Sequence, residues 1–129
     1  MTVSALAAVA PPPAPLPVVR AAVLPDVAGM EVLMAPFVAT GDLLPRTNYD
    51  LCRHIKEYVV VEGPDGAIVG TASLKIYSTE LAEIAGLAVR DDLQGQGVGR
   101  VLVESLLADA RALGLAAAID WLTQFDWKD

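Results

Sequence analysis

The sequence predicts a mixed α/β domain in which a buried strand leads through a glycine-rich turn into a long helix. Residues 84–89 are apolar and end in a β-branched valine, which suits a strand in the core of a sheet. Three glycines stand at alternate positions within residues 95–99, soon after this run. From residue 98 to residue 113, apolar residues recur every three or four positions, the period of an amphipathic helix, and Gly114 suits its C-terminal cap.

The first half of the chain is predicted to supply one strand and two helices. A strand is expected at residues 18–22, and a helix begins at residues 24–26, with proline and an acidic residue in its first turn. Pro36 is expected to end or kink that helix. Thr47 and Asp50 have the spacing of a capping box, which predicts a second, short helix.

The remaining segments complete a sheet. Residues 58–62 and 67–77 have the composition of strands, and the turn signals between them predict a hairpin. Residues 115–122 are apolar and are expected to form the last strand. The predicted order is β-α-α-β-β-β-α-β, a mixed sheet with helices on its faces. Residues 1–17 are rich in alanine and proline and are expected to form a disordered arm, so the domain would span residues 18–129.

Composition limits the classes of function. A chain of 129 residues with 54% hydrophobic residues suits one globular domain. The net charge of −7 argues against a nucleic-acid partner, because phosphate binding needs clustered cations. Cys52 and His54 are each the single residue of their type, so neither a disulfide nor a metal site is expected. No apolar run is long enough to span a membrane, and a cytoplasmic location is therefore the expectation.

The glycine-rich turn has the chemistry of an anion-binding loop. The first amides of a helix have no intrahelical partners, and they lie at the positive end of the helix dipole. Glycines remove the Cβ atoms that would keep an anion away from those amides. Arg100 can add a full positive charge at the same place. The turn is therefore predicted to bind a phosphate or pyrophosphate, although a loop that only connects two elements is the plainer alternative.

Three nucleotide-binding motifs compete for this turn. A P-loop needs Lys followed by Ser or Thr after its last glycine, and here Arg100 follows Gly99. A dinucleotide fingerprint needs a third glycine where Arg100 stands; Asp120 could serve as its acidic residue, but the chain ends soon afterwards. The third motif, Q/R-x-x-G-x-G/A, is matched by Gln94, Gly97 and Gly99, and in this respect the chain resembles the GNAT acetyltransferase superfamily.

The resemblance covers residue 18 to about residue 123 and implies a GNAT fold that binds acetyl-CoA. In that family the cofactor lies where the fourth and fifth strands separate, with its pyrophosphate on the glycine loop. Transferred to this sequence, the strand-end contacts fall on Leu87 and Val89. The loop contacts fall on Gln94, Gly95, Gln96, Gly97, Val98, Gly99 and Arg100.

One branch of the superfamily, the acetyltransferase domain of N-acetylglutamate synthases, resembles the chain in more segments. These are residues 43–46 (LLPR), 58–74 (YVVVEGPDGAIVGTASL), 82–89 (AEIAGLAV) and the Leu-Thr pair at 122–123. The family normally continues with another helix and further strands, and that helix commonly holds a tyrosine that protonates the leaving thiolate. We expect the short C-terminus to leave a sheet edge open, and a homodimer to form there through Phe125 and Trp127.

Two charged residues are candidates for catalysis and acceptor binding. Glu83 could accept the proton of the acceptor amine, and alternation along a strand is expected to put it on the same face as Leu87 and Val89. A solvated carboxylate at the strand end is the alternative. Arg46 could bind an acceptor carboxylate with both guanidinium arms, or it could be a surface arginine in a loop.

Other polar residues are assigned structural roles. Lys75 and Tyr77 could reach an acceptor pocket, but packing roles are favoured, and His54 is expected to be a solvated surface side chain.

The predicted function is transfer of an acetyl group from acetyl-CoA to the amine of a small amino acid, with glutamate as one candidate acceptor. A non-catalytic acetyl-CoA-binding module and a protein N-acetyltransferase are the alternatives. No metal is expected to take part.

Overall fold

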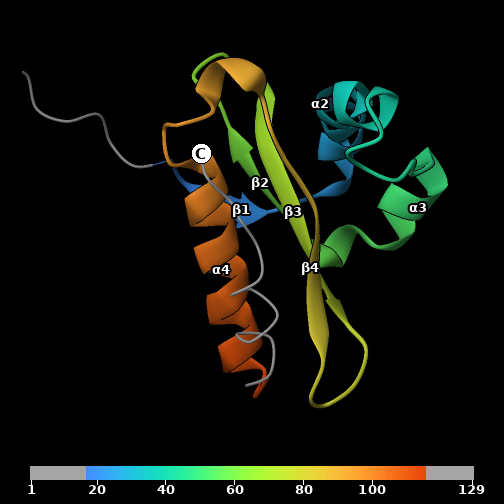
Figure 1. The fold of residues 1–129 in the computed structure, drawn as a ribbon, viewed down its shortest axis with the longest axis vertical. Helices are drawn as coiled ribbons and strands as arrows, with labels where there is room; N and C mark the ends of the chain where they lie inside the picture. The colour runs from blue at the N-terminus through green and yellow to red at the C-terminus, as the bar shows by residue number, and fades with distance from the viewer. Residues whose placement is uncertain (1–16, 116–129) are drawn as a thin grey trace, which may run out of the picture.

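Four strands form one antiparallel sheet in the order β1-β2-β3-β4 (Figure 1). The structure is a computed structural model that describes residues 17–115. The strands are β1 (Val19–Ala21), β2 (Tyr58–Glu62), β3 (Ile68–Ile76) and β4 (Ala82–Val89). These strands confirm the sequence prediction to within two residues at each end. Apart from residues 17 and 115, the predicted arm and the predicted fifth strand lie outside the described residues.

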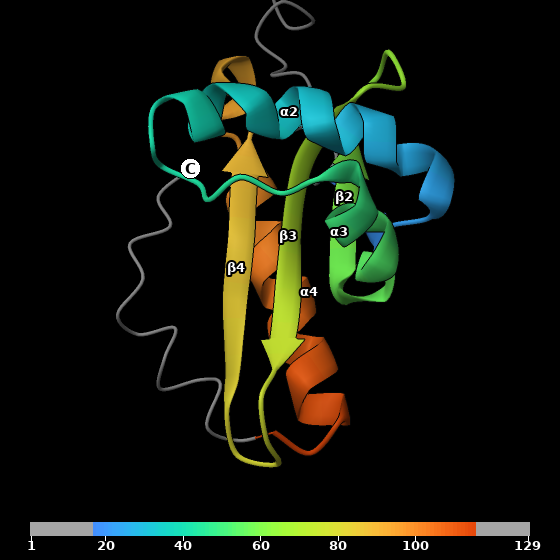
Figure 2. The same cartoon turned by 90° about the vertical axis from the view of Figure 1, so that its right-hand side faces the viewer.

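Helices cover both faces of the sheet. Helix α4 (Val98–Ala112) packs on one face, and α2 (Val27–Ala39) with α3 (Asn48–Arg53) lies on the other (Figures 1 and 2). Three short 3₁₀ helices connect these elements: η1 (Leu24–Asp26), η2 (Ile55–Glu57) and η3 (Asp91–Leu93). Each face has its own apolar core, so the observed architecture is the predicted mixed α/β fold.

Local sequence signals account for most helix ends. The predicted capping box opens α3, because the Asp50 amide donates to Thr47 Oγ1 at 3.1 Å and the Thr47 amide donates to Asp50 Oδ2 at 3.2 Å. At the end of α4, the Leu115 amide donates to the Ala110 carbonyl at 2.8 Å, and the Gly114 amide to that of Arg111 at 3.0 Å. These bonds satisfy carbonyls that the helix would otherwise leave without partners.

Pro36 was predicted to end or kink its helix. It does not end the helix, because α2 continues to Ala39. Proline lacks an amide hydrogen, so the Val32 carbonyl loses its helical partner. Val32 is 76% exposed, which leaves that part of the helix open to water. On the opposite side, Met30 and Met34 are buried against the sheet and hold the helix in place.

Helix α4 sits unusually close to the sheet at Gly70 in β3. A Cβ atom added at Gly70 would lie 2.6 Å from Val98 Cγ1 and 3.0 Å from Leu102 Cδ1. Both neighbours are buried, with exposed fractions of 3% and 0%. The first turn of α4 therefore rests on the backbone of β3, which fixes where the helix begins.

A β-bulge in β4 changes which residues face each layer. Opposite β3, Ala85 pairs with Ser73 and Ala88 pairs with Thr71, so three steps along β4 match two along β3. Gly86 lies inside this interval with φ +65°, a conformation that favours glycine. The extra residue reverses the alternation of side chains between the two halves of the strand.

The bulge overturns the expectation that Glu83, Leu87 and Val89 share a face. Ile84 and Val89 both lie in the core beneath α4, which strict alternation would not allow, and Leu87 packs against the same core. Glu83 pairs with Lys75, beyond the bulge, and points to the face that carries α2 and α3. The sheet therefore separates Glu83 from the two predicted strand-end contacts.

A buried carboxylate ties β1 to the start of the helical layer. Asp26 is 9% exposed and accepts two hydrogen bonds from Arg20, at 2.8 and 2.9 Å, and one from the Val23 amide at 2.8 Å. Arg20 also donates to Glu62 Oε1 at 2.6 Å. The Arg20 guanidinium, helped by the Val23 amide, holds the pKa of Asp26 below its usual range despite burial.

Asp26→Asn should lower the free energy of unfolding by about 1–3 kcal/mol at pH 7, because it removes a charge-assisted pair. The folded pKa lies below the unfolded value, so this contribution is complete above about pH 4 and is lost as the pH falls through the folded pKa. Urea denaturation at pH 7 and pH 3 measures it. The exposed Asp109→Asn is the matched control, and a deficit of equal size at both pH values would contradict the assignment.

Candidate functional site: the glycine loop and an acceptor hollow

The glycine loop joins η3 to α4 and presents the first amides of that helix. Gly97 is the residue before α4 and has φ +90°, which places it in the left-handed region that glycine adopts without strain. The Val101 amide donates to the Gly97 carbonyl at 3.1 Å and makes the first helical hydrogen bond. The amides of Val98 and Gly99 precede that bond, where a helix offers donors to an anion.

Glutamine side chains close the loop onto the end of β4. Gln94 Nε2 donates to the Val89 carbonyl at 3.2 Å and to Asp91 Oδ1 at 3.1 Å. Gln96 Nε2 donates to the Asp92 carbonyl at 3.3 Å. Gln94 therefore holds the shape of the loop from within, a role that the motif alone does not reveal.

The charges beside the loop are organised around Arg90. Its Nε lies 2.7 Å from Asp92 Oδ1, and its Nη1 lies 3.9 Å from Asp65 Oδ2. The Arg90 guanidinium lowers the pKa of the Asp92 carboxyl. Arg100 is exposed in the first turn of α4. A cation from α4 and the helix amides therefore lie on the same turn, as the sequence predicts.

A separate hollow of about 420 Å³ lies on the α2–α3 side of the sheet. We call it the acceptor hollow and define it by its main polar lining residues: Arg46, His54, Glu57, Tyr58, Lys75 and Tyr77. They come from the loop before α3, from the α3–η2 region, from the neighbouring strands β2 and β3, and from the residue that follows β3. Residues far apart in the sequence thus enclose one polar space.

Arg46 connects this hollow to the bulge. A Cβ atom added at Gly86 would lie 3.4 Å from Arg46 Cζ and 3.4 Å from Arg46 Nη2. The half-buried guanidinium therefore lies over the bulge of β4, and its Nη1 also donates to the Leu44 carbonyl at 3.2 Å. A Cβ atom at position 86 would be in contact with this guanidinium, and the positive φ would strain any residue that carries one.

Tyr58 gives the hollow a phenol that sequence reasoning did not single out. It is 3% exposed, and burial raises the pKa of its phenol, although the nearby charge of Arg46 acts in the opposite direction. The hydroxyl is therefore a hydrogen-bond donor at neutral pH. The pairing of Tyr58 with Ser73 across the predicted hairpin is the signal that could have placed it on this face.

Glu83 does not line the acceptor hollow itself, but it is linked to the hollow through Tyr77. The Tyr77 hydroxyl donates to Glu83 Oε1 at 2.7 Å, and Lys75 is the direct cross-strand partner of Glu83. His54 is exposed, as predicted, but it lines the hollow and its Nδ1 lies 3.1 Å from Glu57 Oε2. The structure thus brings Arg46, Lys75 and Tyr77 to one place near Glu83.

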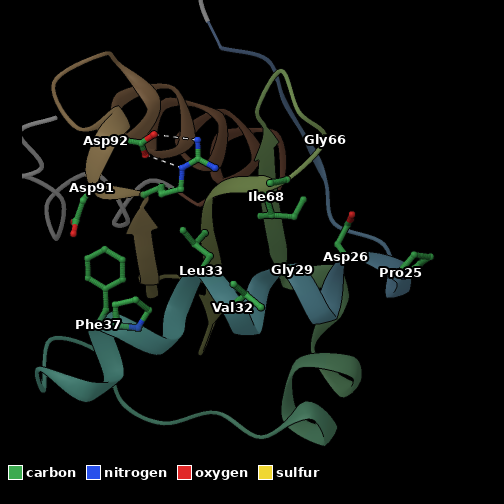
Figure 3. Close-up of a pocket in the computed structure, with 13 residues that line it drawn as sticks. Pro25, Asp26, Gly29, Val32, Leu33, Phe37, Gly66, Ile68, Asp91 and Asp92 are labelled. Carbon is green, nitrogen blue, oxygen red and sulfur yellow. Dashed lines mark hydrogen bonds and ion pairs between the residues drawn. The ribbon is translucent and has the colours of Figure 1, made fainter.

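A second hollow, of about 730 Å³, lies on the other side of α2 (Figure 3). Its floor is apolar, with Gly29, Leu33 and Ile68, and Asp91 and Asp92 stand at one end. None of the predicted site residues lines it. Its chemistry offers no match to the predicted reaction, so we place the candidate site at the glycine loop and the acceptor hollow.

Residues 17–115 lack the features of two other kinds of site. Within this range no group of three or more His, Cys, Asp or Glu side chains is arranged to hold a metal ion. No helix in the same range is long and apolar enough to cross a membrane.

The fold, the glycine loop and the strand before it define the class of protein. The chain belongs to the Acetyltransferase (GNAT) family, whose sequence pattern matches residues 29–127. It is similar to the amino-acid acetyltransferase of Ralstonia nicotianae, with 43% identity over 97 residues that cover 74% of this chain and 21% of that protein. The amino-acid acetyltransferase of Azotobacter vinelandii is 39% identical over 97 residues, with 74% and 22% covered. The chain therefore spans about a fifth of the length of these relatives.

Solved structures confirm the GNAT fold. N-acetylglutamate synthase from Neisseria gonorrhoeae, complexed with coenzyme A and N-acetyl-glutamate, superposes with a TM-score of 0.76 at 31% identity. That match covers 81% of this chain and 24% of the other. A Mycobacterium tuberculosis protein in complex with CoA superposes with a TM-score of 0.72 at 35% identity, covering 77% of this chain and 60% of the other.

Gly97→Val should abolish acetyl-CoA binding, because a branched side chain at this position blocks the approach of a pyrophosphate to the helix amides. The measurement is titration calorimetry with acetyl-CoA. Gly41→Val is the control for backbone strain, since Gly41 has φ +83° with no atom within 4 Å of an added Cβ. An unchanged affinity in folded Gly97→Val would show that the pyrophosphate binds elsewhere.

Proposed function

We propose that this chain is an acetyl-CoA-dependent N-acetyltransferase whose acceptor is the amine of a small amino acid. The observation that carries the proposal is the position of Arg46 over the bulge of β4, inside a hollow of about 420 Å³. A guanidinium suits a carboxylate because it can donate two parallel hydrogen bonds. Similarity to amino-acid acetyltransferases and to a synthase solved with N-acetyl-glutamate supports the same acceptor class.

The two substrates would occupy different parts of the candidate site. Gly97 and the first amides of α4 suit the pyrophosphate of acetyl-CoA, and Leu87 and Val89 at the end of β4 are proposed to contact the rest of the cofactor. When bound, acetyl-CoA supplies the activated acetyl group. Amides at the end of β4 are proposed to stabilise the oxyanion that develops during transfer.

Glu83 is proposed as the general base. The amine of an amino acid is protonated at neutral pH and must lose a proton before it can attack. Glu83 is half-buried and faces the side of the sheet on which the acceptor hollow lies. A carboxylate linked to the hollow through Tyr77 could accept this proton directly or through one water molecule.

The cations of the hollow favour an acceptor with two carboxylates. Arg46 and Lys75 both line it, and the Tyr58 hydroxyl adds a donor between the helical layer and the sheet. One cation could bind the α-carboxylate and the other a side-chain carboxylate. Glutamate is therefore the acceptor that we propose first, which would give the chain a role in amino-acid biosynthesis.

The alternatives make different demands on the site. A protein N-acetyltransferase would use the hollow for a chain terminus, and a non-catalytic module would bind acetyl-CoA without transfer. The cations in the hollow favour a free amino acid over the N-terminus of a peptide, because the first residue of a peptide has no α-carboxylate. We also propose a cytoplasmic location, where a soluble amino acid and acetyl-CoA meet.

Acetyl transfer to a panel of amino acids and peptide amines tests the function, with thiol release as the measurement. We expect glutamate to be among the best acceptors. Arg46→Met should raise the KM for the amino acid by roughly 10–100-fold and leave acetyl-CoA affinity unchanged, because a charged hydrogen-bond pair is lost only on the acceptor side.

Arg53→Met serves as the control for that experiment, since Arg53 is exposed on α3 and does not line the hollow. Turnover of peptides but not of amino acids would support the protein N-acetyltransferase instead. Acetyl-CoA binding without any turnover would support the non-catalytic module.

A homodimer through the C-terminal region remains a proposal, because residues 116–129 lie outside the described part of the chain. An additional strand pairing with an open sheet edge would supply the association, and Phe125 and Trp127 would be its apolar anchors. The mass of the single chain is 13.5 kDa, and light scattering at micromolar concentration should give twice this value. A single-chain mass that persists on concentration would refute the dimer.

A further inference from the structure

We propose that Tyr77 is a positioning residue that holds the Glu83 carboxylate toward the acceptor hollow. The proposal rests on the assignment of Glu83 as the base. Its geometric basis is the hydrogen bond of 2.7 Å from the Tyr77 hydroxyl to Glu83 Oε1. Tyr77 lines the acceptor hollow, and its hydroxyl connects the hollow to Glu83 by a hydrogen bond.

The backbone around Tyr77 fixes the phenol relative to Glu83. The Tyr77 amide donates to the Leu81 carbonyl at 2.9 Å, and the Ser78 amide donates to the same carbonyl at 3.2 Å. Ser78 Oγ accepts from the amides of Glu80 and Leu81, each at 3.1 Å. Lys75 and Glu83 pair with each other in the two strands that this turn connects. The side chains of Tyr77 and Glu83 therefore extend from the closed end of one hairpin.

The phenol remains protonated at the pH of the reaction. The hydrogen bond to Glu83 raises the pKa of the Tyr77 phenol above its ordinary value, and burial and the charges of Glu83 and Glu57 act in the same direction. The Tyr77 hydroxyl therefore keeps its proton and remains a donor to Glu83.

The bond also orients the carboxylate. A donor to Oε1 restricts rotation of the carboxylate and sets the direction of Oε2. Phenol and carboxylate both lie at the surface, and Tyr77 is 60% exposed, so packing explains little of this arrangement. Tyr58, in contrast, is 3% exposed and its ring lies in the core beneath α2 and α3.

The test compares Tyr77→Phe with Glu83→Gln and with the double variant. Glu83→Gln should lower kcat by roughly two to four orders of magnitude and remove the acid limb of the pH profile. Tyr77→Phe should lower kcat roughly three- to tenfold and leave the KM for acetyl-CoA unchanged, because the carboxylate loses the donor that orients it. The double variant should match Glu83→Gln, since Tyr77 acts through Glu83.

Tyr49→Phe is the matched control, because Tyr49 is 69% exposed on α3 and does not line the hollow. The remaining titratable groups around the hollow, which every variant keeps, are Arg46, Asp50, His54, Glu57, Tyr58 and Lys75. A kcat that is unchanged in Tyr77→Phe would overturn the proposal while leaving Glu83 as the base. A further loss from Tyr77→Phe in the Glu83→Gln background would also overturn it.

A second measurement separates this proposal from the proposed function. Carbon-13 NMR at pH 7 follows the chemical shift of the Glu83 carboxyl in the whole chain, whether or not any amine is acetylated. This chemical shift should change in Tyr77→Phe, which removes the hydrogen bond, and should not change in Tyr49→Phe. An identical chemical shift in all three would refute the role of Tyr77, even if the acceptor panel succeeded.

Discussion

One extra residue in β4 is the constraint on which the candidate site depends. The bulge at Gly86 lets Ile84 and Val89 enter the same core, although residues five positions apart in a regular strand point to opposite faces. It turns Glu83 toward the acceptor hollow and leaves Leu87 on the side of α4. It also makes room for the guanidinium of Arg46 at a strand position without a side chain. In a regular strand, residues 83, 87 and 89 would share one face, because each is an even number of steps from the others.

The fold was predictable where the chemistry is local. The capping box at Thr47 begins α3, turn residues separate β2 from β3, and the period of apolar residues sets the length of α4. Pro36 was misjudged because the rule against proline in a helix ignores the strong burial of Met30 and Met34 beside it. The bulge was missed because strict alternation was assumed, although a lone glycine inside a strand, Gly86, is a known signal for one.

The site divides in the same way. The glycine loop could be found in the sequence, because an anion cradle is built from consecutive backbone amides and needs no distant residue. The acceptor hollow could be found only in part, because Arg46, Tyr58 and Lys75 are brought together by the layering of helices on the sheet. Arg46 was singled out by its charge and Glu83 by its place before an apolar strand, but the phenol that joins Glu83 to the hollow is visible only in three dimensions.

The seating of α4 on Gly70 restricts how this protein can change. The smallest side chain at position 70 would meet the side chains of Val98 and Leu102, so the packing of α4 on the sheet would have to shift. A shift of α4 would move the amides at its start, and with them the proposed anion site. A screen of random variants for acetyl-CoA binding alone would therefore reject substitutions at Gly70, although this position is buried in the sheet. Mutational tolerance at Gly70 reports on the cradle as much as on folding.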